Sequence, residues 1–338
     1  MSEALARRPA TLEDVAREAG VSRSTVSRVI NNIRNVDPEL QQVVRDAVAA
    51  TGYVPNAAAR ALVTRRAGAV ALVFSGTPGQ GEIFTDPFFG RVVSGVIGAL
   101  RPLGVHPVLM LADDAAAREE VLSFLRQGNA DGAMLVSTRA GDPLPGRLVE
   151  AGLPVVMFGS PPEGLADGVS WVDLANVEGG RLAAGLLRGR GCRRIVSIAG
   201  PSALSAGRDR LAGVREVLGD VPSAEGDFGQ ASGAAAMARL LASCPDLDGV
   251  VAANDLMARG AVAVLAEHGR RVPEDVAVVG FDDSSAATGG LPLLSTVRQP
   301  VELMAAEMAR ILLERVVGSA SGTASVVFEP ELVVRESA

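Results

Sequence analysis

The chain is long enough for two or three domains, and its charge is unevenly distributed. It has 338 residues, of which 48% are hydrophobic, and a formal net charge of −7. Residues 1–66 nevertheless hold ten arginines against seven acidic residues, whereas residues 67–338 hold 22 arginines against 32 acidic residues. The acidic body excludes nucleic-acid binding along the whole chain, and the basic N-terminal segment favours DNA contact through one end.

Composition and short motifs argue against several other classes of protein. The two cysteines, Cys192 and Cys244, show no pairing pattern, which is typical of a reducing cytoplasm. No apolar run resembles a signal peptide or a membrane span. The sequence also contains no Walker A motif, no G-x-S-x-G elbow and no Cys/His cluster with zinc spacing. We therefore expect a cytoplasmic protein that is not an enzyme and has no cofactor and no membrane partner.

The segment that follows the first ten residues shows the pattern of a helix-turn-helix. Thr11 can cap a first helix, with Asp14 as its reciprocal partner. Gly20 occupies the position where the chain must turn sharply before a second helix. A third helix is predicted from Pro38 to Thr51. Because three short helices bury only a small core, we expect this unit to be marginally stable by itself.

The second helix has an apolar face and a polar outer face. Val26, Val29 and Ile30 recur at the spacing of a buried face. The outer face is left with Arg23, Ser24, Ser27 and Arg28. Arginine can donate two parallel hydrogen bonds to a guanine edge, and serines near a helix N-terminus suit phosphate contacts. The alternative is that Gly20 merely separates two surface helices of an ordinary α-helical domain.

Several spaced motifs resemble those of the lactose-repressor (LacI/GalR) family of bacterial transcription regulators. They are LEDVAREAGVSRSTVSRVIN, GYVPNAAARAL, GRDRLAGV, VVAANDLMARGA, VPEDVAVVGFDD and PLLSTVRQP, in register from Thr11 to about Ser337. The resemblance implies that Arg23 and Ser24 choose operator bases and that Leu62 is an apolar wedge between base steps. The implied DNA-binding residues are Leu12, Arg23, Ser24, Thr25, Ser27, Arg28, Asn31, Tyr53, Asn56, Ala59 and Leu62. Without the resemblance, a simple linker leucine is an equal alternative for Leu62.

The resemblance also implies a division of the chain into four parts. These are a flexible tail over 1–10, a helix-turn-helix DNA-binding domain over 11–56, a hinge helix over 57–66, and an effector-binding and dimerisation domain over 67–338. An isolated helix as short as the hinge is marginal in water. We therefore hypothesise that the hinge folds only on the operator.

From about residue 69 onward, short apolar runs alternate with amphipathic runs of helix length. This alternation predicts parallel sheets in a doubly wound α/β fold. The two successive series resemble the lobes of a periplasmic-binding-protein-like domain, between which the chain crosses three times. The expected N-terminal lobe takes about 67–170 and 295–318, and the C-terminal lobe takes about 174–288 and 320–335.

Ligands of such sheets bind beyond the carboxyl ends of the strands, where Asn254 and Asp282 each follow an apolar run. The resemblance implies that the cleft between the lobes binds an effector through Arg210, Phe228, Asn254, Asp282, Phe88 and Phe89. Carboxylates and amides can bond sugar hydroxyls, and aromatic faces suit sugar rings. The alternatives are a helix cap for Asp282 and core packing for the three phenylalanines.

Together these features indicate a transcriptional repressor that acts as a homodimer on palindromic operator DNA under the control of a small-molecule effector. We expect a saccharide effector, although Gly159 and Ser160 stand where many sugar-responsive relatives carry an acidic residue. A purine or another small metabolite is therefore the alternative effector. The alternative class of protein, a solute-binding protein for transport, needs a signal peptide.

Overall fold

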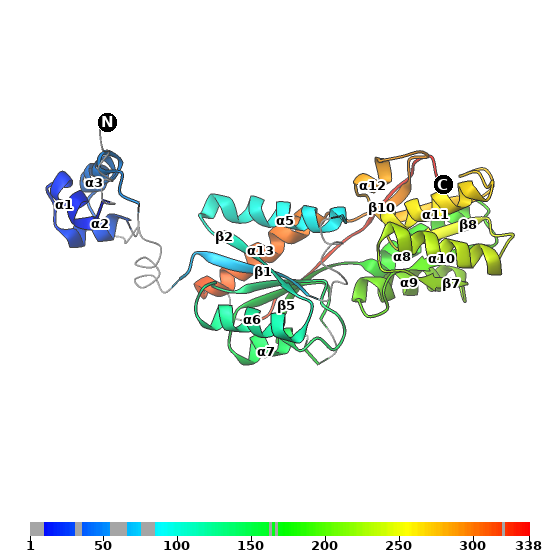
Figure 1. The fold of residues 1–338 in the computed structure, drawn as a ribbon, viewed down its shortest axis with the longest axis horizontal. Coiled ribbons are helices and arrows are strands. Elements are labelled where there is room, and N and C mark those ends of the chain that lie inside the picture. The colour runs from blue at the N-terminus through cyan, green and yellow to red at the C-terminus, as the bar shows by residue number, and fades with distance from the viewer. Residues whose placement is uncertain are drawn as a thin grey trace, which may run out of the picture. The chain divides into compact units, whose positions relative to one another are not determined.

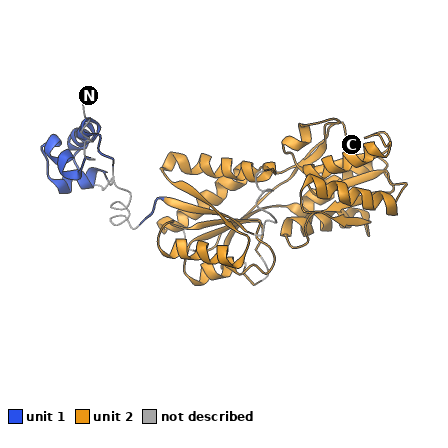
Figure 2. Ribbon diagram, viewed as in Figure 1, with its two compact units in different colours: residues 1–68 blue, residues 69–338 orange. Residues whose placement is uncertain are grey.

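The computed structural model of the protein contains two compact units. The structure describes residues 10–30, 36–54, 66–75, 85–161, 164–165, 168–319 and 322–338. Contacts divide the chain into one unit over residues 1–68 and a second over residues 69–338 (Figure 2). No helix in the described ranges is long and apolar enough to cross a membrane.

The first unit is a bundle of three short helices, α1 (Leu12–Ala19), α2 (Arg23–Ile30) and α3 (Pro38–Thr51). The predicted cap of α1 is present, because the backbone N–H of Asp14 donates to Thr11 Oγ1 and that of Thr11 donates to Asp14 Oδ2. Gly20 ends α1 with a φ of 65°, in the left-handed region that glycine tolerates. The small core consists of Val15, Val26, Val29, Val44 and Ala47.

The second unit begins with a six-stranded parallel sheet of order β11-β5-β4-β3-β1-β2. Its strands are β1 (Ala69–Ser75), β2 (His106–Ala112), β3 (Ala133–Val136), β4 (Val155–Phe158), β5 (Ser170–Leu174) and β11 (Ser325–Phe328). Helices α5 (Pro87–Leu100) and α13 (Val301–Val317) cover one face, and α6 (Ala115–Arg126) and α7 (Leu144–Glu150) cover the other (Figure 1). A 3₁₀ turn, η2 (Arg101–Leu103), follows α5.

A second six-stranded sheet has the order β12-β10-β9-β8-β6-β7. Its strands are β6 (Ile195–Ala199), β7 (Ser223–Glu225), β8 (Gly249–Ala252), β9 (Ala277–Asp282), β10 (Ser295–Arg298) and β12 (Glu331–Val333). The last of these is antiparallel to its neighbour. Helices α8 (Asn176–Gly189) and α9 (Ser205–Leu218) pack on one face, and α10 (Gln230–Ser243) and α11 (Asp255–Glu267) pack on the other. The short α12 (Ser285–Thr288) follows β9.

The expected fold class is therefore present, but the crossings between the two lobes lie later in the chain than predicted. Strand β5 belongs to the first sheet, so the first crossing follows Leu174, whereas the prediction placed it between about 170 and 174. Strand β10 pairs with β9, so residues 295–298 belong to the second lobe. Strand β11 pairs with β5, so the last crossing falls between Phe328 and Glu331. A short strand carries no local mark of the sheet it joins, because that choice depends on pairing with distant residues.

Close packing of α8 on α9 places the residues that matter below. A Cβ on Gly213 would lie 1.9 Å from the carbonyl oxygen of Val177, and one on Gly180 would lie 2.2 Å from that of Arg210. The two backbones can therefore approach only because these positions lack side chains. This approach holds the turn of α9 that carries Arg210 close to the start of α8.

Candidate functional site

The polar face predicted for α2 is exposed in the first unit. Arg23, Ser24 and Arg28 are exposed, whereas Val26 and Val29 are buried. Ser22 Oγ accepts from the backbone N–H of Thr25 at 3.1 Å and therefore caps the start of the helix. The N-terminal end of α2 thus presents hydroxyl and guanidinium groups to the exterior.

Arg23 forms an ion pair with Glu13 in this structure. The Nη1 to Oε1 distance is 2.9 Å, and the two side chains are 69% and 57% exposed. An ion pair this exposed contributes about 0–1 kcal/mol, so Arg23 can leave it at little cost to contact another group.

The other predicted DNA-binding residues are of two kinds. Leu12 and Tyr53 are partly buried against the core of the unit, and Thr25 and Ser27 are partly exposed on α2. Asn31, Asn56, Ala59, Leu62 and almost all of the predicted hinge helix lie outside the described residues.

In the second unit, one cavity opens between the two lobes at the carboxyl ends of their strands. All six predicted effector-binding residues line it: Phe88, Phe89, Arg210, Phe228, Asn254 and Asp282. Further lining residues, which sequence reasoning did not select, include Asp86, Ser137, Thr138, Asp173, Asn176 and Gln299. They lie at or just beyond the carboxyl ends of strands of both sheets, which is where a doubly wound fold binds ligands.

Arg210 is the central cation of the cavity. It is only 6% exposed, and its guanidinium donates to Asn176 Oδ1 at 2.9 Å, to the carbonyl of Ala253 at 2.6 Å and to Gln299 Oε1 at 2.9 Å. It also lies 3.7 Å from the ring centre of Phe281, in cation–π geometry. A buried charge with this many partners is fixed in position before any ligand arrives.

Two polar atoms of the cavity, Asp282 Oδ1 and Thr138 Oγ1, have no hydrogen bond within the described part of the chain. The Oδ1 atom of Asp282 lies 3.1 Å from Arg210 Nη1, but it receives no well-aligned hydrogen bond from the described residues. The hydroxyl of Thr138 is likewise buried and has no partner among those residues. A buried polar group without a hydrogen bond costs roughly 1–3 kcal/mol. A ligand that forms hydrogen bonds with these two atoms would remove this cost, and its complex with the protein would be more stable.

The backbone is strained at the same place. Phe228 has a φ of 74° and Asp282 a φ of 97°, both in the left-handed region that residues with a side chain rarely adopt. Asn254 holds the first of these, because its Nδ2 donates to the carbonyl of Phe228 at 2.8 Å while its Oδ1 caps α11 at Met257. Strain of this kind is typical of ligand-binding positions.

Aromatic rings form the wall contributed by the first lobe. The ring of Phe88 makes edge-to-face contacts with Phe89 and Phe158, with centroid separations of 5.4 Å in both pairs. Phe89 also meets Phe74 at 5.1 Å. Phe88, Phe89 and Phe158 line the cavity and also pack in or against the core of the lobe, whereas Phe74 belongs to the core alone. For Phe88 and Phe89, cavity lining and core packing are therefore both present.

Asp86 is an acidic residue of the cavity that the sequence analysis did not select. It caps α5, because the backbone N–H of Phe88 donates to its Oδ1 at 2.9 Å. Burial raises the pKa of Asp86 to about 6, and the nearby charge of Asp282 acts in the same direction. The sequence signal for it was the Asp-Pro pair before an apolar helix, which also marks an ordinary cap.

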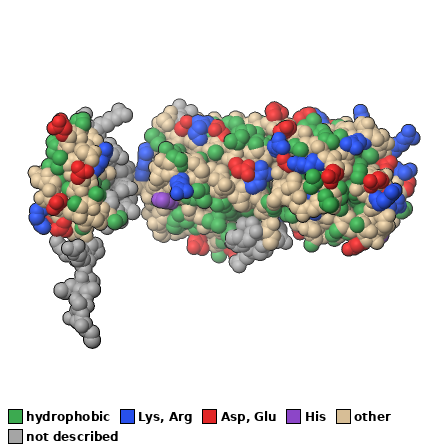
Figure 3. Space-filling model, turned by 90° about the horizontal axis from the view of Figure 1, so that it is seen from above, with side chains coloured by type: hydrophobic (Ala, Val, Ile, Leu, Met, Phe, Trp, Pro, Cys, Tyr) green, Lys and Arg blue, Asp and Glu red, His purple; other side chains and the backbone are tan. Residues whose placement is uncertain are grey.

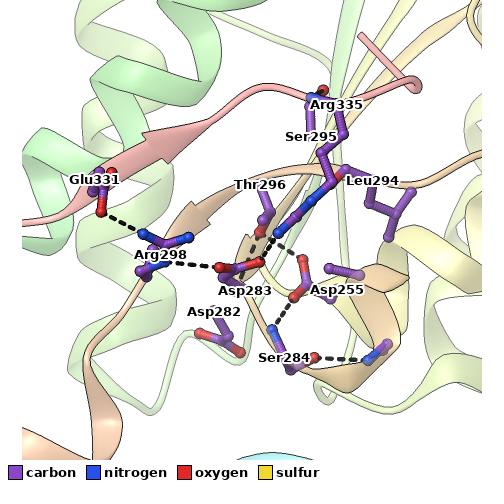
Figure 4. A network of polar contacts seen from close by, with 12 residues as sticks. Asp255, Asp282, Asp283, Ser284, Leu294, Ser295, Thr296, Arg298, Glu331 and Arg335 are labelled. Carbon is purple, nitrogen blue, oxygen red and sulfur yellow. Dashed lines mark hydrogen bonds and ion pairs between the residues drawn. The ribbon is translucent and has the colours of Figure 1, made fainter. Parts of the chain in front are cut away.

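Only one residue of the Asp282–Asp283 pair faces the cavity. Figure 4 shows Asp283 held between Arg298 and Arg335, with Nε and Nη2 atoms at 2.8 and 2.5 Å from its carboxylate. Asp255 is also structural, because it accepts from the backbone N–H of Ser284 at 2.7 Å and from Thr296 Oγ1 at 2.6 Å. These contacts leave Asp282 as the carboxylate of the pair that is available to a ligand.

Gly159 and Ser160 follow β4, where many sugar-responsive relatives carry an acidic residue, and in this structure another acidic residue lies beside them. Gly159 has a φ of 97°, and the next residue, Ser160, donates its backbone N–H to Asp173 Oδ2 at 2.8 Å. Asp173 lines the cavity, and burial raises its pKa above the ordinary value. An acidic group from β5 therefore lies beside the position that lacks one after β4.

Arg91 links the cavity to helix α5. Its guanidinium donates to the carbonyls of Asp282 at 2.9 Å and Gln299 at 3.0 Å, and it pairs with both carboxylate oxygens of Glu302 at 2.7 and 2.8 Å. These partners lie on the second lobe, on the crossing and on α13. Arg91 thus connects the backbone of Asp282 to α5 and α13 of the first lobe.

Acidic and basic side chains are interspersed over the face of the second unit seen in Figure 3. This mixed surface differs from the basic excess of residues 1–66.

Comparison with known proteins identifies the family. A model of "Bacterial regulatory proteins, lacI family" matches residues 11–56, and a model of a "Periplasmic binding protein-like domain" matches residues 184–338. The chain is 46% identical over 338 residues to the HTH-type transcriptional regulator CelR of Thermobifida fusca, an alignment that covers 98% of this chain and 99% of the relative. The chain belongs to the LacI family.

Solved structures of LacI-family proteins share the architecture. The transcriptional regulator CelR in complex with cellobiose is 43% identical, covers 97% of this chain and 100% of its own, and has a TM-score of 0.77. The lac repressor dimer bound to operator and the anti-inducer ONPF is 26% identical, covers 98% and 99%, and has a TM-score of 0.81. This LacI-family chain is therefore a transcriptional regulator with a helix-turn-helix unit and a two-lobed α/β unit.

Proposed function

We propose that this LacI-family regulator is a repressor that binds a palindromic operator as a homodimer, and that a saccharide of the cellobiose class controls its affinity for the operator. The observation that carries the effector proposal is the cavity between the lobes, which combines aromatic walls with two buried polar atoms that have no hydrogen bond within the described residues. The complex of the related CelR with cellobiose supports the class of ligand. The structure of the lac repressor dimer bound to its operator supports the proposed homodimer on a palindromic operator.

For DNA, we propose that residues 11–56 read the operator and that residues 57–66 form a hinge. Arg23 and Ser24 choose bases, and Arg28 contacts phosphate, because these side chains are exposed along α2. Thr25 and Ser27 on the same helix, and Leu12 and Tyr53 beside it, support the contact. The proposals for Asn31, Asn56, Ala59 and Leu62 depend on the family resemblance alone.

For the effector, we propose that residues 67–338 bind a sugar through complementary groups on the two lobes. Asp282 accepts from sugar hydroxyls, and Asn254 and Arg210 fix the polar wall of the second lobe. Phe88, Phe89 and Phe228 present apolar surface to the faces of sugar rings. Thr138 offers a further hydroxyl from the first lobe.

The effector acts by binding one arrangement of the lobes better than the other. Typical couplings of this kind are about 1–3 kcal/mol. The Arg91 contacts give a route from Asp282 to α5 and α13. We propose no enzymatic role, since the relatives described above are transcriptional regulators, and we propose that the protein acts in the cytoplasm, where operator DNA lies.

A ligand screen followed by an operator assay tests this proposal. Thermal melting of the full-length protein is measured against mono- and disaccharides, polyols, purines and amino acids, because a true ligand raises stability as RT ln(1 + [L]/Kd). Fluorescence anisotropy with a palindromic operator, with and without the active compound, then measures the coupling. We expect cellobiose to raise the melting temperature and to change operator affinity.

Three results would contradict the proposal at different points. A shift with purines but not with sugars would assign the alternative effector, since aromatic walls also stack on purines. A sugar that binds without changing operator affinity would remove the regulatory step. Operator affinity that does not depend on sequence would remove the DNA-reading role of α2.

A further inference from the structure

A second compartment adjoins the cavity between the lobes. The inner compartment, described above, has a volume of about 100 Å³, and the outer one has a volume of about 410 Å³. The residues that line both are Asp86, Phe89, Ser137, Leu204 and Phe228. The two compartments therefore adjoin at these five side chains.

The inner compartment is small for an effector of the expected kind. Ligand pockets that bury most of a small molecule usually measure about 300–1,000 Å³. A ligand of two sugar rings that engages Arg210 and Asp282 therefore cannot lie wholly in the inner compartment, and it must extend past the shared side chains. We expect the second ring of such a ligand to lie in the outer compartment.

We propose that the outer compartment is a second glycosyl subsite, which binds the ring next to the one held by Asp282 and makes the regulator selective for a disaccharide over a monosaccharide. This inference rests on the proposed saccharide effector. The subsite is contributed by both lobes, with Arg139 from the first and with Asp227 and Gln230 from the second.

The chemistry of the outer compartment suits a solvated sugar ring. Arg139, Asp227 and Gln230 are exposed, and their side chains supply donors and acceptors at its edge. The guanidinium of Arg139 has no hydrogen-bond or ion-pair partner within the described ranges, so binding a hydroxyl breaks no existing contact. Leu204 and Leu256 give the compartment an apolar surface, which suits the face of a ring.

Two features hold this compartment in shape. The backbone N–H of Ala140 donates to the carbonyl of Ala203 at 2.8 Å, which ties the loop after Arg139 to the loop before Leu204 across the two lobes. The carboxylate of Asp227 accepts from the backbone N–H of Gly229 at 2.7 Å, which orders the turn that carries the strained Phe228. A subsite formed in advance loses less conformational entropy when the ligand binds.

The test compares ligand truncation with side-chain truncation in the full-length protein. Isothermal titration measures glucose and cellobiose affinity for the wild type, Arg139→Ala and Gln230→Ala, with competition against cellobiose where glucose is weak. The control is Arg126→Ala, an exposed arginine at the end of α6 that lines neither compartment. Thermal melting of each variant confirms that the fold is retained.

We expect each outer-compartment variant to weaken cellobiose about fivefold to tenfold, as for loss of one ligand hydrogen bond, and to leave glucose within about twofold. The control should change neither sugar. Equal weakening of glucose and cellobiose, or unchanged affinity for cellobiose, would overturn the subsite while the saccharide effector stands. A wild-type protein that binds neither sugar would overturn the saccharide effector itself, and the subsite with it.

Discussion

Replacing Asp86 by asparagine separates the charge of this cavity residue from its role as a helix cap. The carboxylate accepts from the backbone N–H of Phe88, and asparagine caps a helix about as well as aspartate. The substitution therefore keeps the hydrogen bond at the start of α5 and removes one partly buried negative charge. Burial, with help from Asp282, is what raises the pKa of this carboxyl to about 6 from an ordinary value of 3.8.

The raised pKa of Asp86 determines both the sign and the size of the expected change in the free energy of unfolding. Between pH 3.8 and about 6 the folded state binds the proton more tightly than the unfolded state does. The free energy of unfolding of the wild type therefore falls as pH rises through this window, and below it the penalty is absent. One pKa unit corresponds to about 1.4 kcal/mol, so the charged form costs up to about 3 kcal/mol above pH 6. Asp86→Asn removes this cost.

Urea unfolding measures the difference between Asp86→Asn and the wild type. Trp171 is the single tryptophan of the chain and lies in β5, so its fluorescence reports on the second unit. At constant protein concentration, we expect the variant to be more stable by up to about 3 kcal/mol at pH 8, and the difference to shrink towards zero near pH 4.

The matched control is Asp114→Asn. Asp114 caps α6 by accepting from the backbone N–H of Ala117 at 2.7 Å, but this cap is exposed. We expect its substitution to change stability little at any pH. A stability difference for Asp86→Asn that does not depend on pH, or a variant less stable than the wild type at pH 8, would refute the reasoning from burial.

Four further predictions follow from the contacts described above. Thr11→Ala removes the cap of α1 and should cost about 1 kcal/mol, seen as faster hydrogen exchange of the α1 amides; unchanged exchange would argue against the capping box. Gly213→Ala places a Cβ against the Val177 carbonyl and should cost about 3 kcal/mol in urea unfolding, whereas Gly185→Ala, which faces open space, should be neutral or stabilising. Arg91→Met removes the donor to the carbonyls of Asp282 and Gln299 together with the partner of Glu302, and should cost about 2 kcal/mol in the same assay, compared with little for Arg310→Met, whose ion pairs on α13 are exposed; equal losses would contradict the assignment. Arg23→Ala should reduce selectivity between operator variants, whereas Arg28→Ala should weaken binding to all of them and lower the salt dependence, as anisotropy titrations would show; the reverse pattern would exchange their roles.

Much of the fold was predictable because its signals are local. The cap at Thr11, the turn at Gly20 and the apolar spacing of α2 involve residues within about one helical turn of each other. The alternation of apolar runs with helices likewise predicts parallel sheets without knowledge of their order. The residues after β8 and β9 could be selected because strand ends in such folds form the binding edge.

Other residues of the cavity carry no comparable signal. Thr138 and Gln299 follow β3 and β10, and nothing in their neighbourhood distinguishes them from loop residues elsewhere. The sequence around Asp86 predicts a helix cap, and the structure confirms that it caps α5. Its position in the cavity depends in addition on how the start of α5 lies relative to the second lobe.

By itself, the sequence determined the family, the helix-turn-helix, the two series of strands and the chemistry after several of those strands, because each of these depends on neighbouring residues or on a motif of fixed spacing. The tertiary structure decided which sheet β10 and β11 join, how Arg210 is fixed among groups from three segments, and that an outer compartment adjoins the inner one. These features depend on pairing and packing between residues far apart in the chain, which spacing along the sequence does not encode.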